Sequence, residues 1–390
     1  PKAYQISQYE LPLARHGWLG VEGADGEARR VRIRRVHMEE DTGKLTHLDS
    51  GGSLVDYNRS GVPLLEIVSE PDIRSGEEAR SFTSKIRQIL RYLGVNSGDM
   101  EKGVLRVEPN ISIRPVGSDI LGTRTELKNL NSFRALADGT DFEIKRQSAV
   151  LDAGETVIQE TRGWHDTRRV TFSQRVKEEA DDYRYFAEPD LPPLLLDEAW
   201  IEEIRAELPE LPDAKIARYC ETLGLSAYDA GVLAGDRRVA DFYDTAVNAG
   251  GEPKTMANWM INDLFALMNE HKQSIDQSMV SPGALVELGG LVGDQTINSS
   301  TAVKVLAEMF ASGKGAGEIV AERGLAQISD EAVLAEVIAQ ILRENEDEVA
   351  AYKAGNEKLK GWFVGQVMRA TRGQANPALV NRLLAEQLSD

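Results

Sequence analysis

The sequence has little cysteine, no long apolar stretch and no excess of positive charge. Its one cysteine, Cys220, excludes an internal disulfide and a cysteine-built zinc site, as is typical of proteins of a reducing cytoplasm. The longest apolar runs, such as residues 191–196 with their two prolines, are far shorter than the roughly 20 residues that cross a bilayer. The 45 Lys and Arg against 63 Asp and Glu give a net charge of −18, which argues against a nucleic-acid coat or adsorption to an anionic membrane.

Several catalytic motifs are also missing. The chain contains no GxxxxGK[ST] sequence, so a P-loop nucleotide site has no support. The five histidines are scattered, which leaves a histidine-rich zinc site or a Cys–His nucleophile without support. Cys220 lies in a helical pattern and is interpreted as a small core residue.

The 390 residues predict two or three domains. Residues 30–186 alternate short β-rich runs with turns and a few helices, whereas nearly every segment after residue 209 has helical periodicity. Prolines at 189, 192, 193, 209 and 212 mark the change, so we expect a boundary near residue 205. The chain opens without methionine or a signal-peptide layout, and we expect that residues upstream are missing.

A helix of about 18 residues is predicted after Ser75, which has capping-box spacing to Glu78. Apolar residues then recur every three or four positions until Gly94. The outer face carries Arg80, Lys85, Arg87 and Arg91. We interpret it as a solvated face in preference to a phosphate-binding track.

Two neighbouring segments, 104–114 and 123–131, alternate polar and apolar residues as strands do. The polar face of the first carries Arg106, Glu108 and Asn110, and that of the second carries Lys128. Such faces form either a wet sheet surface or the floor of a polar cleft. Alternation alone favours solvent exposure.

Acidic residues in two other segments point to chemistry. Glu66 lies in an apolar run, 61–68, that has the composition of a strand buried on both faces. A carboxylate there is expected to be protonated, paired with Arg or Lys, or bound to a cation. Residues 35–44 contain three carboxylates, a histidine and a lysine. Such oxygen ligands suit Mg²⁺, although an acidic turn explains them equally well.

Two further segments leave alternatives open. In the turn 56–61, Arg59 is suited to bidentate binding of a phosphate or carboxylate, and an Asx turn is the structural alternative. Residues 351–390 carry six Lys and Arg against three acids, a net of +3 in an acidic chain. This basic region, with a helix amino terminus at Asn376-Pro377, suits RNA phosphates or is an ordinary helical bundle.

Seven runs together resemble the GatB proteins of the bacterial aspartyl/glutamyl-tRNA amidotransferases, the GatCAB complexes. They are Lys-Ala-Tyr-Gln-Ile-Ser-Gln at 2–8, His-Met-Glu-Glu-Asp at 37–41, Asp-Tyr-Asn-Arg-Ser-Gly at 56–61, Glu-Ile-Val-Ser-Glu-Pro-Asp at 66–72, Glu-Leu-Lys-Asn-Leu-Asn-Ser-Phe at 126–133, Asp-Tyr-Arg-Tyr-Phe at 182–186 and Phe-Val-Gly-Gln-Val-Met at 363–368. The resemblance covers essentially the whole chain.

The resemblance implies an α+β protein of three parts. A cradle domain with antiparallel sheet, related to glutamine synthetase, is expected over residues 1–205, a helical domain over 206–322 and a YqeY-like, tRNA-binding tail over 323–390. It also implies a cytoplasmic heterotrimer with the amidase GatA and the small protein GatC. With ATP and Mg²⁺, GatB phosphorylates the side-chain carboxylate of Glu-tRNA(Gln) or Asp-tRNA(Asn), and ammonia from the amidase then displaces the phosphate.

Site residues follow from the same resemblance. Glu40 and Glu66 are the expected Mg²⁺ ligands and, with Lys128, the expected catalytic residues. Contacts to phosphate or carboxylate are expected from Lys44, Asn58, Arg59, Arg106 and Asn110. Contacts to tRNA are expected from Lys358, Lys360, Arg369 and Arg372.

Two points qualify this expectation. The family draws two more metal ligands, a Glu and a His, from an early strand that precedes the present sequence. The alternative is therefore a non-catalytic, tRNA-binding scaffold protein. Moreover, Val107-Glu108-Pro109 stands where the family usually reads Cys-Asp-Ala, and the proline is expected to alter that strand.

Overall fold

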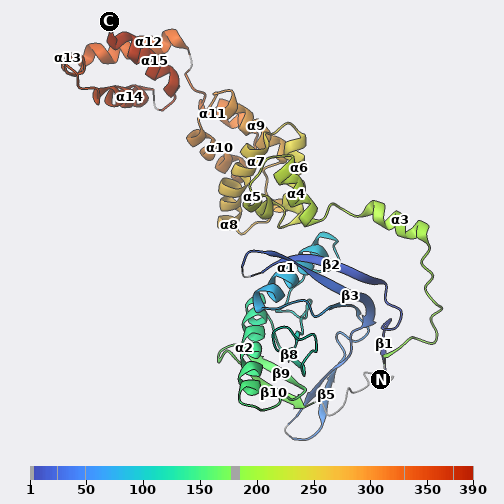
Figure 1. Cartoon of the computed structure of the whole chain (residues 1–390). Coiled ribbons are helices and arrows are strands. Elements are labelled where there is room, and N and C mark those ends of the chain that lie inside the picture. Colours follow the sequence, from blue (N-terminus) through green and yellow to red (C-terminus); the bar gives the residue numbers. More distant parts are fainter. Residues whose placement is uncertain are drawn as a thin grey trace. The chain divides into compact units, whose positions relative to one another are not determined.

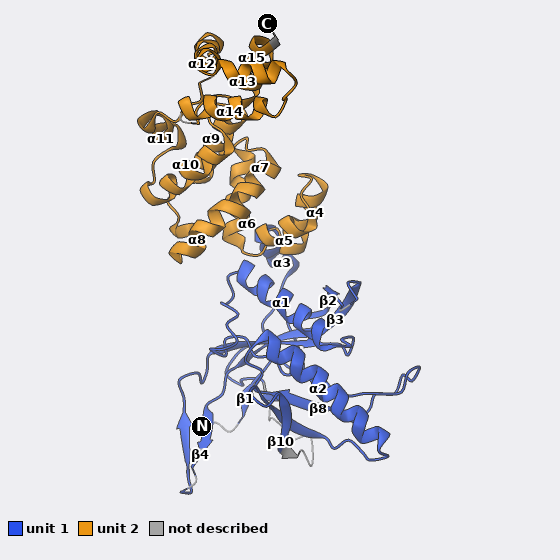
Figure 2. Ribbon diagram, turned by 90° about the vertical axis from the view of Figure 1, so that its left-hand side faces the viewer, with its two compact units in different colours: residues 1–209 blue, residues 210–390 orange. Residues whose placement is uncertain are grey.

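The computed structural model describes residues 4–23, 25–48, 50–176, 185–328, 330–371 and 373–389. The chain forms two compact units, residues 1–209 and 210–390 (Figure 2). Within the described helices, none combines the length and the apolar character needed to cross a bilayer. The sequence run 182–184 and Arg372 lie outside the described residues.

The first unit mixes strands and helices, which confirms the α+β prediction (Figure 1). Its strands are β1 (Gln5–Ile6), β2 (Ala14–Glu22), β3 (Ala28–Glu40), β4 (Lys44–His47), β5 (Ser53–Asp56), β6 (Pro63–Ser69), β7 (Asn110–Ile111), β8 (Thr125–Lys128), β9 (Glu160–His165), β10 (Val170–Val176) and β11 (Tyr185–Phe186). Its helices are α1 (Gly76–Tyr92), α2 (Phe133–Asp152) and α3 (Glu198–Glu207).

Two sheets form most of this unit. One is antiparallel with the order β2-β3-β6, so that β6 is an edge strand. The other has the order β10-β9-β8-β7, in which only β8 and β9 run parallel. The strands β4 and β5 form a separate hairpin, and β1 pairs with β11.

Helices α1 and α2 pack against each other, and α2 also covers the four-stranded sheet. Helix α1 begins where the sequence predicts, because the Ser75 hydroxyl accepts a hydrogen bond from the Glu78 amide. Gly76 permits the close approach, since a Cβ there would lie 2.2 Å from the carbonyl oxygen of Ala137. The outer face is not uniformly solvated. Arg87 lies over the Phe133 ring, with its Cζ 5.5 Å from the ring centre.

The two alternating segments are extended but form shorter strands than predicted. Within these segments, only Asn110–Ile111 and Thr125–Lys128 pair as strands of the sheet. The strand Asn110–Ile111 begins directly after Pro109, which has no amide hydrogen to donate. The predicted faces nevertheless form: Leu127 and Ile111 are buried, whereas Arg106 is exposed and Lys128 half-buried.

All named elements of the second unit are helices among its described residues, as its periodicity predicts, and one isolated parallel bridge joins Ile328 and Ala375. Its helices are α4 (Pro212–Glu221), α5 (Ala227–Leu233), α6 (Arg237–Asn248), α7 (Pro253–Asn258), the π-helix η1 (Trp259–Leu264), α8 (Phe265–His271), the 3₁₀ helix η2 (Ile275–Gln277), α9 (Pro282–Gly293), α10 (Ser299–Ser312), α11 (Ala316–Arg323), α12 (Glu331–Glu344), α13 (Glu346–Lys353), α14 (Leu359–Ala370) and α15 (Pro377–Ser389). Helices α4–α11 share one apolar core, and α12, α14 and α15 share a second one.

Candidate functional site

Strands β3 and β6 bring an imidazole and two carboxylates together. Side chains alternate along a strand, so His37 and Glu39 share one face of β3. In the antiparallel register, Glu66 of β6 lies directly opposite His37. The three side chains therefore meet on one face of the sheet, and we call them the His37 cluster.

The His37 cluster is compact. His37 Nε2 lies 3.0 Å from Glu39 Oε1 and 3.0 Å from Glu66 Oε2, and the three ligand atoms lie within 4.8 Å of one another. The side chains of His37 and Glu39 are buried, whereas that of Glu66 is 43% exposed. Solvent therefore reaches the cluster from the side of Glu66.

The amino-terminal segment fixes the Glu39 carboxylate. Ser7 Oγ donates a hydrogen bond of 2.9 Å to Glu39 Oε1, and Gln5 Nε2 donates one of 3.1 Å to Oε2. Each carboxylate oxygen thus has a donor from the run 2–8. No pattern in the sequence connects this run with the acidic segment, because the contacts join distant parts of the chain.

Electrostatics set Glu66 apart from an ordinary exposed glutamate. Partial burial raises its pKa above the usual value, and the negative charge of Glu39 acts in the same direction. His37 and Arg35 oppose this effect, while the charge of Glu108 adds to it. A bound cation would therefore relieve the concentration of negative charge in the cluster.

The spacing of the His37 cluster fits a small divalent cation. With metal–ligand distances of about 2.1 Å, adjacent ligands of an octahedron lie about 3.0 Å apart. The two distances from His37 Nε2 have this value. Two carboxylates suit a hard cation such as Mg²⁺, and the imidazole extends the fit to Mn²⁺.

The structure changes two expectations about this region. Glu40 does not join the His37 cluster, because it follows Glu39 on β3 and points to the opposite face. Its Oε1 accepts a hydrogen bond of 3.3 Å from the Ile6 amide. The strand that holds Glu66 is not buried on both faces, because β6 is the edge of its sheet. Of the three states expected for Glu66, pairing with Arg or Lys is not found among the described residues, and its carboxylate lies beside His37 instead.

The structure brings together two of the predicted anion-binding residues, Arg59 and Arg106. Arg59 Nε lies 3.0 Å from one Asp41 oxygen, and an Arg106 amino group lies 3.1 Å from the other. The Asp41 carboxylate is buried, while both arginine side chains remain about half exposed. Asp41 thus holds two guanidinium groups side by side, two residues along the chain from Glu39.

Lys128 and Asn110 belong to another polar group, on β7 and β8. Lys128 Nζ lies 3.2 Å from Glu108 Oε2 and 3.6 Å from Glu126 Oε1. Asn110 lies opposite Glu126 in the strand register, and its side-chain amide donates to the Glu108 carbonyl at 3.3 Å. The negative charge of Glu108 also contributes to the raised pKa of Glu66.

Lys44 and Asn58 have less specific surroundings. Lys44 is exposed on β4, where it lies opposite Asp56 in the hairpin register. The Asn58 amide donates a hydrogen bond of 2.9 Å to Asp56 Oδ1, which forms the structural Asx turn considered from the sequence. The structure does not bring either residue into the His37 cluster.

A buried carboxylate on α2, that of Glu143, links this helix to strands β8 and β10. It accepts hydrogen bonds from Thr125 Oγ1 of β8 at 2.7 Å and from Thr171 Oγ1 of β10 at 3.1 Å. Arg146 donates to both of its oxygens. Burial alone raises the pKa of Glu143, but hydrogen bonds from Arg146, Gln147 and Thr125 bring it below its usual value. Glu143 is therefore ionised and fully paired.

The predicted tRNA contacts on α14 and at its N-cap, Lys358, divide between two faces. Lys358, Trp362 and Arg369 are exposed and recur at helical spacing, so they share a face. Lys360 is half-buried on another side. The start of α15 is already capped, because Asn376 Oδ1 accepts hydrogen bonds from the amides of residues 378 and 379.

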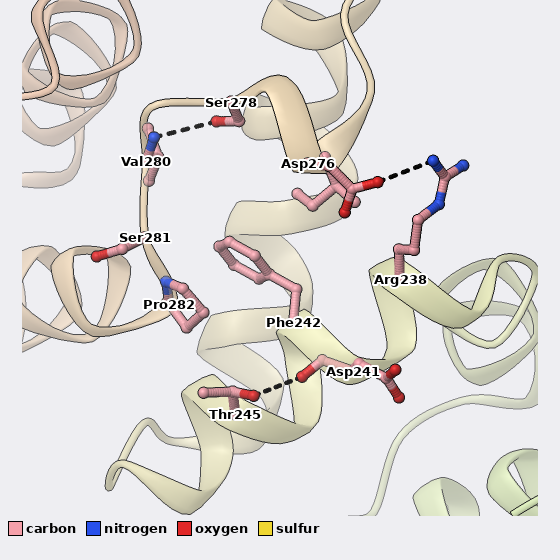
Figure 3. A pocket seen from close by; sticks show the side chains of 10 residues that line it. Arg238, Asp241, Phe242, Thr245, Asp276, Ser278, Val280, Ser281 and Pro282 are labelled. Atoms are coloured by element: carbon pink, nitrogen blue, oxygen red, sulfur yellow. Dashed lines mark hydrogen bonds and ion pairs between the residues drawn. The ribbon is translucent and has the colours of Figure 1, made fainter. Parts of the chain in front are cut away.

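An open cavity of about 360 Å³ lies in the second unit, between α6 and the turn before α9. Figure 3 shows the side chains that line it. The charged groups at its rim already have partners: Arg238 donates to Asp276 at 2.8 Å, and Asp241 lies 3.5 Å from Arg237. The hydroxyl of Thr245 donates to the carbonyl oxygen of Asp241. These polar groups of the cavity therefore already have partners within the protein, and we assign this cavity no role.

Comparison with known protein families agrees with this division into a mixed, site-bearing unit and a helical unit. A family model described as the GatB/GatE catalytic domain matches residues 1–202, and one described as the GatB domain matches residues 241–388. The chain belongs to the GatB family of amidotransferase proteins.

Individual relatives carry a more specific name. The chain is 53% identical to a protein of Moorella thermoacetica, 50% to one of Thermodesulfovibrio yellowstonii and 48% to one of Oceanobacillus iheyensis. Each match covers 100% of this chain and 82% of the relative. All three are named as the B subunit of an aspartyl/glutamyl-tRNA(Asn/Gln) amidotransferase.

Proposed function

We propose that this chain is the activating component of a tRNA-dependent amidotransferase. It transfers the γ-phosphoryl group of ATP to the side-chain carboxylate of Glu-tRNA(Gln) or Asp-tRNA(Asn), and ADP leaves. The nitrogen of ammonia then attacks the activated carbonyl carbon. The C–N bond forms, the C–O bond to the phosphoryl group breaks, and inorganic phosphate leaves. The similarity to named GatB proteins over the whole chain supports this reaction.

The observation that carries the proposal is the His37 cluster within the region matched by the catalytic-domain model. We assign Glu39, Glu66 and His37 as the residues of this chain that hold a divalent cation, in place of the predicted pair of Glu40 and Glu66. Mg²⁺ at this position supplies positive charge to the phosphate groups of ATP. Ser7 and Gln5 keep the Glu39 carboxylate oriented.

The nearby cations bind anionic groups of the reactants. Arg59 and Arg106, aligned by Asp41, present donors to a phosphate or to the acceptor carboxylate. Lys128 neutralises negative charge at the reacting group, and Asn110 on the neighbouring strand remains a candidate contact to phosphate or carboxylate. We retain Lys44 and Asn58 as weaker candidates for contacts to ATP.

The remaining parts serve tRNA and the partner proteins. We propose a catalytic domain over residues 1–205, a helical domain over 206–322 and a tRNA-binding tail over 323–390. The two separate apolar cores of the helical unit support the second boundary. The amidase GatA supplies ammonia, and the small protein GatC completes a cytoplasmic heterotrimer. In the tail, Lys358, Lys360, Arg369 and Arg372 are the proposed tRNA contacts.

The test uses the chain assembled with GatA and GatC. ADP release that depends on Glu-tRNA(Gln) is measured together with tRNA affinity and thermal stability. We expect Glu66→Gln to lower ADP release by at least about 100-fold while tRNA affinity stays unchanged, because a metal contributes several kcal/mol of charge stabilisation. The matched control is Glu101→Gln, which alters an exposed glutamate outside the site.

Two results would contradict the proposal. If the wild-type assembly binds tRNA without releasing ADP, the chain is the non-catalytic scaffold that was the alternative. If Glu66→Gln releases ADP at the wild-type rate, the His37 cluster does not take part in the reaction. Loss of tRNA binding together with a lowered melting temperature would assign Glu66 a structural role.

A further inference from the structure

Two of the five arginines on β3 differ from the others. Arg29, Arg32 and Arg34 each pair with a carboxylate at 2.8 Å or less. Arg30 and Arg35 have no carboxylate partner among the described residues, and Arg30 lies over the Trp18 ring. Arg35 is the one of these two that is two positions from His37 on the same strand, so its side chain emerges on the face that carries the His37 cluster.

Aromatic rings hold the Arg35 side chain in place. Its Cζ lies 3.7 Å from the centre of the Tyr9 ring, a close cation–π contact. Tyr9 is stacked on Tyr185 with ring centres 5.2 Å apart, and its ring meets His37 edge-on at 5.9 Å. The guanidinium group therefore lies against the Tyr9 ring, which in turn contacts His37 of the cluster.

The hydrogen-bonding capacity of Arg35 is largely unused within the described chain. One amino group donates to the Tyr9 carbonyl at 3.4 Å, and the buried Nε finds no acceptor. The side chain is half-buried, so these missing hydrogen bonds carry a cost. A multidentate oxyanion that reached the amino groups would give them the charged acceptor that they lack among the described residues.

The strand register adds a second positive charge. Arg15 of β2 lies directly opposite Arg35 of β3, and like charges in this position destabilise a sheet. Within the described part of the chain, neither arginine forms an ion pair with a carboxylate, and the Arg15 amino group donates to the carbonyl oxygen of Glu10. A bound anion between the two side chains offsets their repulsion.

We propose that Arg35 binds a phosphoryl group of the nucleotide, and that Tyr9 and Tyr185 position its guanidinium group for this contact. The inference rests on the proposed function and assigns a further substrate-binding residue to the same site. A phosphoryl group is favoured because it bears several oxygens: one can meet the cation of the His37 cluster while another meets Arg35. Binding of one phosphoryl group by both the cation and Arg35 explains why one face of the sheet carries a cluster of carboxylates together with a guanidinium group that has no carboxylate partner among the described residues.

The experiment compares binding of a non-hydrolysable ATP analogue and of adenosine by calorimetry, with Mg²⁺, to the chain assembled with GatA and GatC. We expect Arg35→Gln to weaken binding of the analogue about 10- to 100-fold, the range for hydrogen bonds to charged groups, and to leave adenosine binding unchanged. Arg35→Lys keeps the charge without the planar donors and is expected to show an intermediate loss. Arg34→Gln is the matched control, since Arg34 is the neighbouring arginine and pairs with Glu70.

The aromatic clamp, formed by Tyr9 and Tyr185, is tested by a second pair of variants. Tyr9→Leu should weaken binding of the analogue in the same direction as Arg35→Gln, and Tyr9→Phe, which keeps the ring, should not. Equal affinity of wild type and Arg35→Gln for the analogue would overturn the assignment of Arg35, and so would an equal loss for adenosine. If the wild type fails to bind the analogue at all, the proposed function itself is contradicted.

Discussion

His37 and Glu66 face each other across strands β3 and β6, with Nε2 of the histidine 3.0 Å from Oε2 of the glutamate. Glu39 closes the group from the histidine's own strand. The half-exposed Glu66 connects this buried pair to solvent, from which the proposed nucleotide and cation would enter. Changes to these three side chains should therefore affect ATP cleavage more than changes to their neighbours.

Neighbouring glutamates on β3 provide the sharpest test of the cluster. We expect Glu39→Gln to lower ATP cleavage by at least about 100-fold, because Glu39 lies with His37 and Glu66 on the face proposed to bind the cation. Glu40→Gln should have a much smaller effect, since Glu40 points to the other face and accepts from the Ile6 amide. Steady-state ADP release by the assembled enzyme measures both. A larger loss from Glu40→Gln would restore the ligand pair that was predicted from the sequence.

The arginines joined by Asp41 should act as a unit. We expect Arg59→Gln and Arg106→Gln each to lower kcat/KM about 10- to 100-fold, the value of a hydrogen bond to a charged group. The double variant should lose less than the product of the single losses, because both side chains share one carboxylate. If both single variants kept the wild-type kcat/KM, a role of Arg59 and Arg106 in binding substrate would be excluded.

The pH dependence of stability should report an ion pair away from the His37 cluster. A side-chain hydrogen bond from Arg32 is the main cause that lowers the pKa of Asp72 to about 2. Because the folded pKa lies below the unfolded value, this pair stabilises the fold above about pH 4, and the contribution is lost as the pH falls toward 2. Between pH 4 and pH 2, the midpoint of urea unfolding should therefore change less steeply with pH in Asp72→Asn than in the wild type. An unchanged slope would show that the pair contributes nothing.

The Glu143 network should be essential for the first unit. Glu143→Leu leaves Arg146, Thr125 and Thr171 without their acceptor, and we expect it to reduce the free energy of unfolding by about 3–5 kcal/mol. Glu77→Ala is the matched control, because it removes an exposed helix ion pair with Arg80 and should cost less than about 1 kcal/mol. Urea titration of the two variants measures the difference. Similar values for both would contradict the buried-network interpretation.

In the tail, the exposed face of α14 predicts salt-dependent binding. Replacing both Lys358 and Arg369 with Gln should reduce the slope of log affinity for tRNA against log salt concentration by about 0.7 to 0.9 for each phosphate contact removed. Lys304→Gln, an exposed lysine of α10, is the control. If the double variant keeps the wild-type slope, these residues of α14 do not contact phosphates.

Local patterns predicted much of the fold. The Ser75 cap placed the start of α1, and alternation placed Leu127 and Lys128 on opposite faces of β8. The helical periodicity after residue 209 was also confirmed. These features depend on near neighbours in the chain, which is why a sequence pattern suffices.

The site was only partly predictable, because it depends on pairing between distant segments. The sequence shows Glu39 and Glu40 as equivalent neighbours, and only the register with β6 shows which of them meets Glu66. The contacts of Ser7 with Glu39 and the sharing of Asp41 by two arginines are likewise long-range. No local pattern encodes them.

Anomalous X-ray diffraction can locate the cation itself, using crystals of the assembled enzyme grown with Mn²⁺ and a non-hydrolysable ATP analogue. If the His37 cluster is the metal site, an anomalous peak will lie about 2.1–2.2 Å from carboxylate oxygens of Glu39 and Glu66, with the phosphates of the analogue beside it. A nucleotide bound with its metal elsewhere, and no peak between these two carboxylates, would contradict the assignment.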